Sequence, residues 1–108
     1  MIKPKKLNIG DRVAIVSLSS GTAGEELFKH RYELGKRRLE KEFKLKVVTM
    51  PNALKGIDFF KKHPEKRAED LMNAFKDDSI KAIICNIGGN DTIRLLPYIY
   101  FDVIKNNP

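Results

Sequence analysis

Two adjacent glycines followed by small polar side chains form the segment of this sequence whose residue types could take part in chemistry. In "AIICNIGGNDT", residues 82–92, an apolar run ends at Gly88 and Gly89, and Asn90 and Asp91 come next. Glycine readily adopts positive φ angles, which lets backbone N–H groups point at a ligand. One such donor aimed at a developing oxyanion lowers a reaction barrier by about 3–4 kcal/mol. A tight turn in which Asn90 or Asp91 caps a helix explains the same residues equally well, so both interpretations stay open.

A second polar segment, "SLSSG" at residues 17–21, follows another apolar run. Its serines, Ser17, Ser19 and Ser20, could line a pocket, cap a helix or supply a nucleophile. The sequence lacks the Gly-x-Ser-x-Gly turn that exposes a nucleophilic serine, so we favour pocket lining or capping. It also contains neither the dinucleotide fingerprint nor the phosphate-binding loop, and we therefore predict no cofactor.

The two histidines and the single cysteine do not indicate a metal or redox site. His30 and His63 lie far apart, without carboxylates at the spacing of metal ligands, so we predict no metal site. Nothing basic flanks Cys85 to stabilise a thiolate, and we expect it in the core as a small hydrophobe. A lone cysteine cannot form an internal disulfide, which is typical of the cytoplasm.

Three apolar runs predict strands, at residues 12–18, 44–50 and 80–87. Because helical patterns alternate with them, we predict an α/β fold with an open parallel sheet and helices on both faces. Ligands bind beyond the carboxyl ends of such strands, where residues 17–22 and 88–92 fall. A strand order of 2-1-3 puts the third run at an edge, although it is apolar on both faces and therefore expected to be covered on both. Exposed edges promote association, so we expect a homodimer or other self-association.

The first helix is expected over residues 23–43, starting at a capping box formed by Thr22 and Glu25. Gly35 within it costs about 1 kcal/mol relative to alanine, which is tolerable if it permits close packing on the sheet. A second helix should begin at Pro64, where a missing N–H does no harm. A short helix should follow from about Asp91, and residues 52–63 and 100–108 should be connections with a helical turn.

The formal net charge of +7 could indicate a nucleic-acid partner, so its placement matters. Much of it lies within residues 29–46, where lysines and arginines alternate with glutamates. On a helix, these charged residues face away from an apolar stripe in the same region. The stripe consists of Phe28, Tyr32, Gly35, Leu39 and Phe43. We favour a solvated helix face over a phosphate-binding surface, and predict no nucleic-acid partner. No apolar run approaches the ~20 residues that span a bilayer, so we predict no membrane partner either.

Two alternatives from other functional classes remain open. "GGND-T" resembles the Gly-Gly-Asp-Gly-Thr/Ser loop of phosphofructokinases and of NAD or lipid kinases, with Asp91 where that pattern has a glycine. A phosphate-binding module of that kind is one alternative. A basic, non-enzymatic interaction domain is the other.

A further resemblance covers nearly the whole chain. "IKPKKLNIGDRVAIVSLSSG" and "RAEDLMNAFKDDSIKAIICNIGGNDTIRLLPYIYFDVIKNNP" resemble the N-terminal region of the LD-carboxypeptidase family of serine peptidases. The "GGND" motif resembles that of the microcin-C immunity peptidase branch. The resemblance implies a flavodoxin-like N-terminal domain, which family members follow with a separate C-terminal domain. Residues 1–108 are then expected to be a partial N-terminal domain, truncated after the third strand, with the C-terminal domain absent.

The same resemblance implies a Ser–His–Glu triad, none of whose members is in this chain. The nucleophilic serine is expected beyond Pro108, and the glutamate and histidine later still, so residues 1–108 alone should be inactive. Gly88 and Gly89 correspond to the oxyanion-hole loop, with Gly89 the preferred donor. The pocket-lining positions that the resemblance implies are Asn90, Asp91, Ser19 and Ser20. The implied substrate is an amide next to a free carboxylate, in an L,D-linked muropeptide or an aminoacyl-nucleotide antibiotic.

Overall fold

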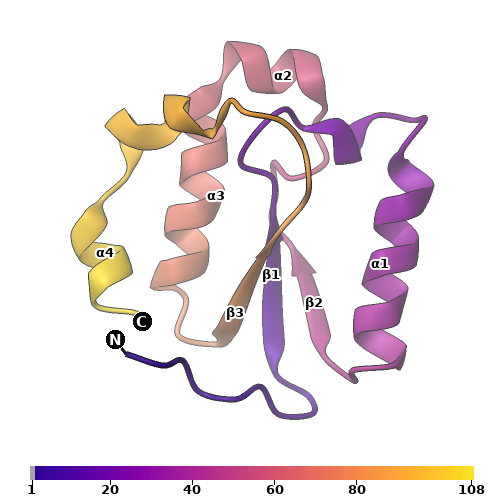
Figure 1. Cartoon of the computed structure of the whole chain (residues 1–108), viewed down its shortest axis with the longest axis vertical. Helices are drawn as coiled ribbons and strands as arrows, with labels where there is room; N and C mark the ends of the chain where they lie inside the picture. Colours follow the sequence, from indigo (N-terminus) through magenta and orange to yellow (C-terminus); the bar gives the residue numbers. More distant parts are fainter. Residues whose placement is uncertain (1) are drawn as a thin grey trace.

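An open sheet of three parallel strands lies at the centre of the computed structural model, which describes residues 2–108. The strands are β1 (Arg12–Val16), β2 (Lys46–Thr49) and β3 (Ile80–Cys85), in the spatial order β2-β1-β3 (Figure 1). β1 pairs in parallel with both neighbours. The predicted α/β class, the parallel sheet and the strand order are thereby confirmed. Met1, the first residue of the predicted domain, lies outside the described residues.

Helices cover both sides of this sheet. α1 (Lys29–Lys41) lies on one side, and α3 (Pro64–Lys76) and α4 (Phe101–Lys105) lie on the other (Figure 1). The short α2 (Ile57–Lys62) and two 3₁₀ helices, η1 (Thr22–Gly24) and η2 (Thr92–Tyr98), gather near the carboxyl ends of the strands. α3 begins at Pro64 as predicted. Within residues 2–108, the helices are all too short or too polar to cross a membrane.

The core is centred on β1, because that strand has a neighbour on each side and helices over both faces. Val13, Ala14 and Val16 have no exposed surface. Ala68 and Met72 of α3 are buried as well, and their spacing of four residues places both on one face of the helix. The helical periodicity of the sequence therefore identified the face of α3 that packs inward.

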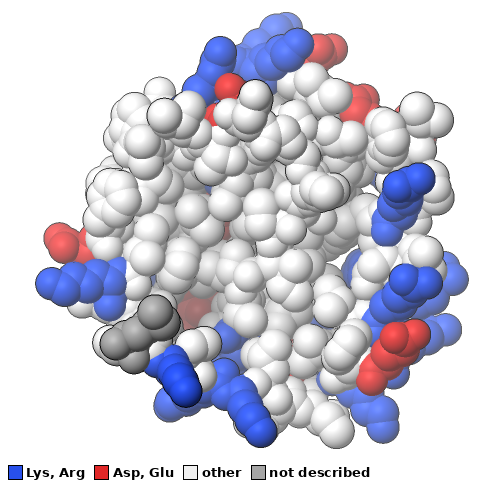
Figure 2. Space-filling model, viewed as in Figure 1, with Lys and Arg blue, Asp and Glu red and all other residues white. Residues whose placement is uncertain are grey.

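β3 is less covered than its apolar sequence predicts. It pairs only with β1 among the described residues, and Ile83 and Ile84 are half-buried. Cys85 is exposed, and Ile87 beyond the strand is 93% exposed. The predictions of full cover on both faces and of a core position for Cys85 are wrong, because α3 packs against β3 whereas α1, on the other side of the sheet, packs against β2. Figure 2 shows a broad uncharged area on the face where Figure 1 shows the strands, with Lys and Arg gathered around its border.

The first long helix starts later than predicted, at Lys29, because the expected capping box does not form. Thr22 opens the short η1 instead, whose first turn has no side-chain cap. Glu25 reaches the start of α2, where its Oε1 accepts a hydrogen bond from the N–H of Ile57 at 2.8 Å. The carboxylate therefore caps a helix that is distant in sequence rather than its own.

The predicted apolar stripe of this helix packs inward only in part. Tyr32 is buried, whereas Phe28 is 38% exposed and Phe43, beyond the end of α1, is 62% exposed. Gly35 is exposed, and a Cβ built on it would have no heavy atom within 4 Å. The prediction that Gly35 permits close packing on the sheet is therefore wrong.

Replacing Gly35 with alanine is expected to raise the free energy of unfolding by about 1 kcal/mol, because alanine has the higher helix propensity and nothing obstructs its methyl group. Urea unfolding followed by circular dichroism measures the change. Gly24→Ala is the matched control with the opposite sign, since a Cβ at Gly24 would lie 2.5 Å from the carbonyl oxygen of Leu54. Equal stability of the two variants would contradict the structure.

Candidate functional site

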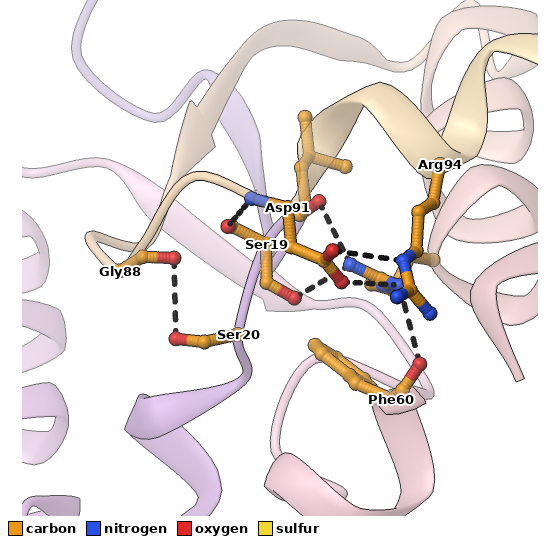
Figure 3. Close-up of polar contacts among 8 residues, drawn as sticks. Ser19, Ser20, Phe60, Gly88, Asp91 and Arg94 are labelled. Carbon is orange, nitrogen blue, oxygen red and sulfur yellow. Dashed lines mark hydrogen bonds and ion pairs between the residues drawn. The ribbon is translucent and has the colours of Figure 1, made fainter. Parts of the chain in front are cut away.

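The loops after β1 and β3, which the sequence predicted to share one edge of the sheet, are hydrogen-bonded to each other. The N–H of Ser20 donates to the carbonyl oxygen of Gly88 at 2.9 Å, and Ser20 Oγ donates to the same oxygen at 3.2 Å. The N–H of Asp91 donates to Ser19 Oγ at 2.9 Å. Four of the six predicted site residues are thus joined directly, as Figure 3 shows.

Both glycines of the β3 loop are required by the backbone. Gly88 has φ 147° and Gly89 has φ 90°, a region that L side chains rarely adopt. A Cβ on Gly88 would lie 2.8 Å from Ser20 Oγ, and one on Gly89 would lie 3.0 Å from Ser19 Oγ. Within residues 2–108, neither glycine's N–H donates a hydrogen bond. The loop therefore combines close approach to the serine loop with two backbone donors that have no internal acceptor.

Asp91 precedes η2, but its side chain does not cap that helix. Its Oδ2 instead accepts from Arg67 Nη2 at 3.2 Å, and its Oδ1 forms an ion pair with Arg94 Nε at 2.9 Å. The helix-capping interpretation of the glycine loop thus does not describe the Asp91 side chain. Its carboxylate is occupied by two arginines, so within this chain Asp91 orients other groups.

Arg67 in the first turns of α3 joins three segments through one side chain. It is completely buried. Its Nη1 donates to the carbonyl oxygen of Ser19 at 2.7 Å, and its Nη2 donates to the carbonyl oxygen of Phe60 at 3.2 Å as well as to Asp91. The guanidinium also lies over the Phe60 ring, 5.5 Å from its centroid. A planar fork of five donors suits acceptors that arrive from separate segments.

Burial of this cation carries a desolvation cost, which its hydrogen bonds and its ion pair oppose. Arg67 Nε has no hydrogen-bond partner among the described residues, and an apolar residue of similar volume often stabilises such a position as well as a buried ion pair does. We therefore attribute to Arg67 the placement of the serine loop and of Asp91. Sequence reasoning missed it, since no local pattern distinguishes Arg67 from its neighbour Lys66, and arginines are mostly exposed.

A cavity of about 360 Å³ lies beside these loops. Four predicted site residues line it, namely Ser19, Ser20, Asn90 and Asp91. α2 and η2 supply the remaining lining residues, which are Ile57, Phe60, Lys61 and Arg94. The sequence predicted the polar half of this lining. It assigned the α2 region to a connection and so missed Ile57, Phe60 and Lys61, and it did not single out Arg94 in the short helix expected from about Asp91.

The serine hydroxyls of the β1 loop form hydrogen bonds within the described residues. Ser17 is buried, donates from Oγ to the carbonyl oxygen of Ala53 at 2.8 Å, and accepts from Asn86 Nδ2 at 2.9 Å. In the described part of the chain, the hydroxyls of Ser19 and Ser20 contact no histidine or carboxylate side chain. A serine without such a base lacks the partner that activates a nucleophile. Over the same residues, no three His, Cys, Asp or Glu side chains come together as a metal site would need.

Asp70, one turn after Arg67, is a buried acid behind the site. Its Oδ2 accepts from the Asn52 N–H and its Oδ1 from Asn52 Nδ2, both at 2.9 Å. Burial raises the pKa of Asp70 above its ordinary value of 3.8, and the bonds from Asn52 only partly oppose this. The folded chain therefore holds this proton to a higher pH than the unfolded chain does, and the ionised carboxylate lowers the stability of the fold. This loss of stability is absent at low pH, where the carboxyl is protonated in both states, and it develops as pH rises through the folded pKa.

We expect the Asp70 carboxyl carbon to titrate by NMR with a midpoint above 3.8, and the Asn52 N–H to shift with the same midpoint. Asp77 is the internal control, because hydrogen bonds from the Ser79 hydroxyl and N–H lower its pKa below 3.8. If Asp70 titrated at or below the midpoint of Asp77, burial would not control its pKa.

The chain is similar in sequence to a family of known proteins. The family described as "LD-carboxypeptidase N-terminal domain" matches residues 13–108. The "Probable murein peptide carboxypeptidase" of Bacillus subtilis (strain 168) is 30% identical over 106 residues, which are 98% of this chain and 31% of that protein. The curated relatives that the chain matches are each covered over 31% of their length.

The chain is also similar to solved structures. An MccF-like protein from Streptococcus pneumoniae, determined in complex with AMP, is 51% identical with a TM-score of 0.81, over 92% of this chain and 29% of that one. The microcin C7 self immunity protein MccF, in an inactive mutant apo state, is 25% identical with a TM-score of 0.83, over 97% of this chain and 31% of that one.

Proposed function

The chain belongs to the LD-carboxypeptidase family, and from that premise we propose that it supplies the oxyanion-binding part of a serine carboxypeptidase site. The observation that carries the proposal is the pair Gly88 and Gly89, with positive φ angles and N–H groups that have no acceptor within residues 2–108. They follow β3 at the carboxyl edge of the sheet, where ligands of such folds bind.

The reaction would be hydrolysis of an amide next to a free carboxylate. A serine, activated by a histidine that a glutamate orients, would attack the carbonyl carbon, and the carbonyl oxygen would become an oxyanion. The Gly89 N–H, with that of Gly88, would donate to this oxyanion and stabilise it in the transition state. The triad would come from polypeptide outside residues 1–108, as the resemblance of the sequence implies, and the site would work in the cytoplasm.

The substrate is an aminoacyl nucleotide or an L,D-linked muropeptide. The greater identity to the MccF-like protein solved with AMP favours the aminoacyl nucleotide, whereas the Bacillus subtilis relative is named for murein peptides. Family membership also favours a carboxypeptidase over the kinase-type phosphate module and the basic interaction domain.

A chimera tests the proposal. Residues 2–108 would replace the matching N-terminal region of the Streptococcus pneumoniae MccF-like protein, and the chimera and its parent would be assayed on an aminoacyl-nucleotide amide and an L,D-tetrapeptide. We expect the chimera to hydrolyse the substrate that its parent hydrolyses. A folded chimera without activity on that substrate would refute the proposal. The 108-residue chain alone should cleave neither compound, and cleavage by it would contradict the assignment of the triad to other polypeptide.

We also propose that the isolated chain self-associates, as a homodimer, through the open edge of β3. Cys85 is exposed on this strand and Ile87 follows it, almost fully exposed. Cys85→Lys would place a charge at this edge, which disfavours strand pairing between chains. Light scattering should show a dimer that this substitution converts to monomer, whereas Phe43→Lys, at an exposed residue after α1, should leave the dimer intact. A monomeric wild-type chain at high concentration would argue against this edge contact.

A further inference from the structure

The cavity beside the glycine loop has a positive rim. Its lining includes two cations, Lys61 from α2 and Arg94 from η2, and a single carboxylate, that of Asp91. Two apolar side chains, Ile57 and Phe60, also line it. A ligand that fits this lining has an apolar or planar portion and an acidic group.

Arg94 forms an ion pair with Asp91 at the edge of the cavity. Its Nε lies 2.9 Å from Asp91 Oδ1, and Figure 3 shows its side chain extending from η2 toward Asp91 and Phe60. In the part of the chain that the structure describes, Nε is the only nitrogen of Arg94 with a partner. The two Nη groups therefore remain available, and a guanidinium presents such groups in a geometry that matches a carboxylate or a phosphate.

The Asp91–Arg94 pair is partly exposed, with 57% of the Arg94 side chain and 34% of the Asp91 side chain accessible, but Asp91 is also anchored from behind by a buried residue. Exposed pairs are mobile and contribute little. Here the second oxygen of Asp91 accepts from Arg67, whose guanidinium is completely buried and is fixed by the carbonyl oxygens of Ser19 and Phe60. The Asp91 N–H is bound by Ser19 Oγ as well. Both the backbone and the carboxylate of Asp91 are thus restrained, so the carboxylate that pairs with Arg94 is held in place.

The charges of this cluster do not cancel. Asp91 is shared between Arg67 and Arg94, so the three side chains together carry one net positive charge, and Lys61 adds another at the rim. Cavities bounded by one sign of charge concentrate ligands of the opposite sign.

We propose that Arg94, positioned by Asp91 and assisted by Lys61, forms a subsite that binds the acidic group of the substrate. The inference rests on the proposed function in taking the occupant of the cavity to be the substrate. The chemistry recognised is a carboxylate or phosphate oxygen, because both accept from the same guanidinium fork. Arg94 determines specificity in this scheme, and Asp91 and Arg67 are positioning residues.

Two ligand pairs that differ only in charge test the subsite on the 108-residue chain. AMP and adenosine differ in a phosphate, and N-acetyl-D-alanine and its amide differ in a carboxylate. Amide and arginine Nε–H signals would be followed by ¹H–¹⁵N NMR, with the Arg94 signal assigned from its loss in Arg94→Gln. We expect the charged member of at least one pair to bind about tenfold more tightly than the neutral member, which is the effect of a charge-assisted hydrogen bond.

Arg94→Gln should reduce that ratio to nearly one, and Lys61→Gln should reduce it by a smaller factor. Lys62→Gln is the matched control, since Lys62 is an exposed lysine of the same helix outside the cavity lining. Preference for AMP alone identifies a phosphate subsite, and preference for N-acetyl-D-alanine alone identifies a carboxylate subsite. Preference for the charged member of both pairs identifies a general acidic subsite. An unchanged ratio in Arg94→Gln, or no charge preference in either pair, overturns the subsite.

The same spectra separate this inference from the proposed function. Shifts of the Arg94 Nε–H with no response of the Gly88 and Gly89 amides would support the subsite and count against the oxyanion role. Responses of those amides that are equal for charged and neutral ligands would overturn the subsite and leave the proposed function standing.

Discussion

Replacing Arg67 with alanine is expected to lower the free energy of unfolding by roughly 3–5 kcal/mol, the range found when one partner of a buried ionic network is removed. The substitution leaves a void beside Phe60 and leaves the carbonyl oxygens of Ser19 and Phe60 without their donors. Because domains of this size are stable by only about 5–15 kcal/mol, much of the total would be lost. Urea unfolding followed by circular dichroism measures the difference.

Two further substitutions separate the packing of Arg67 from its hydrogen bonding. Arg67→Met keeps most of the buried volume, so it should recover much of the stability while still shifting the amide signals of Gly89 and Asp91. Arg67→Lys keeps the charge but loses the planar guanidinium, and one ammonium group cannot reach acceptors in three segments. This variant should therefore restore neither the full stability nor the wild-type amide signals of Gly89 and Asp91. If Arg67→Met left the loop signals in place, the positioning role would be wrong. A fully stable Arg67→Ala variant would contradict the burial itself.

The second large effect concerns the backbone donor at Gly89. In the active chimera, Gly89→Ala should lower kcat by roughly 10²–10³, the loss that follows removal of one oxyanion-hole donor. The methyl group would lie 3.0 Å from Ser19 Oγ at a residue with φ 90°, so the loop must move and its N–H must leave the oxyanion position. KM should change less than kcat, because the donor acts mainly in the transition state.

Gly10 provides the matched control for backbone strain. Its φ of 88° is nearly that of Gly89, but a Cβ there would meet nothing within 4 Å. Gly10→Ala should therefore lose a similar amount of stability, about 1–3 kcal/mol, and keep kcat. Equal losses of kcat in the two variants would attribute the Gly89 effect to general destabilisation. Unchanged kcat in Gly89→Ala would remove the oxyanion role.

The sequence alone determined the architecture and the place of the site. β-branched runs identified the three strands, helical spacing and Pro64 identified α3, and alternation predicted a parallel sheet. In a parallel sheet the carboxyl ends of neighbouring strands share an edge, so the two polar loops had to meet there. Gly88 and Gly89 also stood out, because two glycines in a short loop indicate an unusual backbone or a close approach.

Only the tertiary structure decided the contacts between distant segments. Glu25 caps α2 rather than its own helix, Arg67 is completely buried although no sequence pattern marked it, and Cys85 is exposed at a strand edge instead of packed in the core. Periodicity encodes which face of an element is apolar, since it follows from local backbone geometry. It cannot encode which side chain meets which carbonyl after the elements pack, because those partners are set by the three-dimensional approach of segments far apart in the chain.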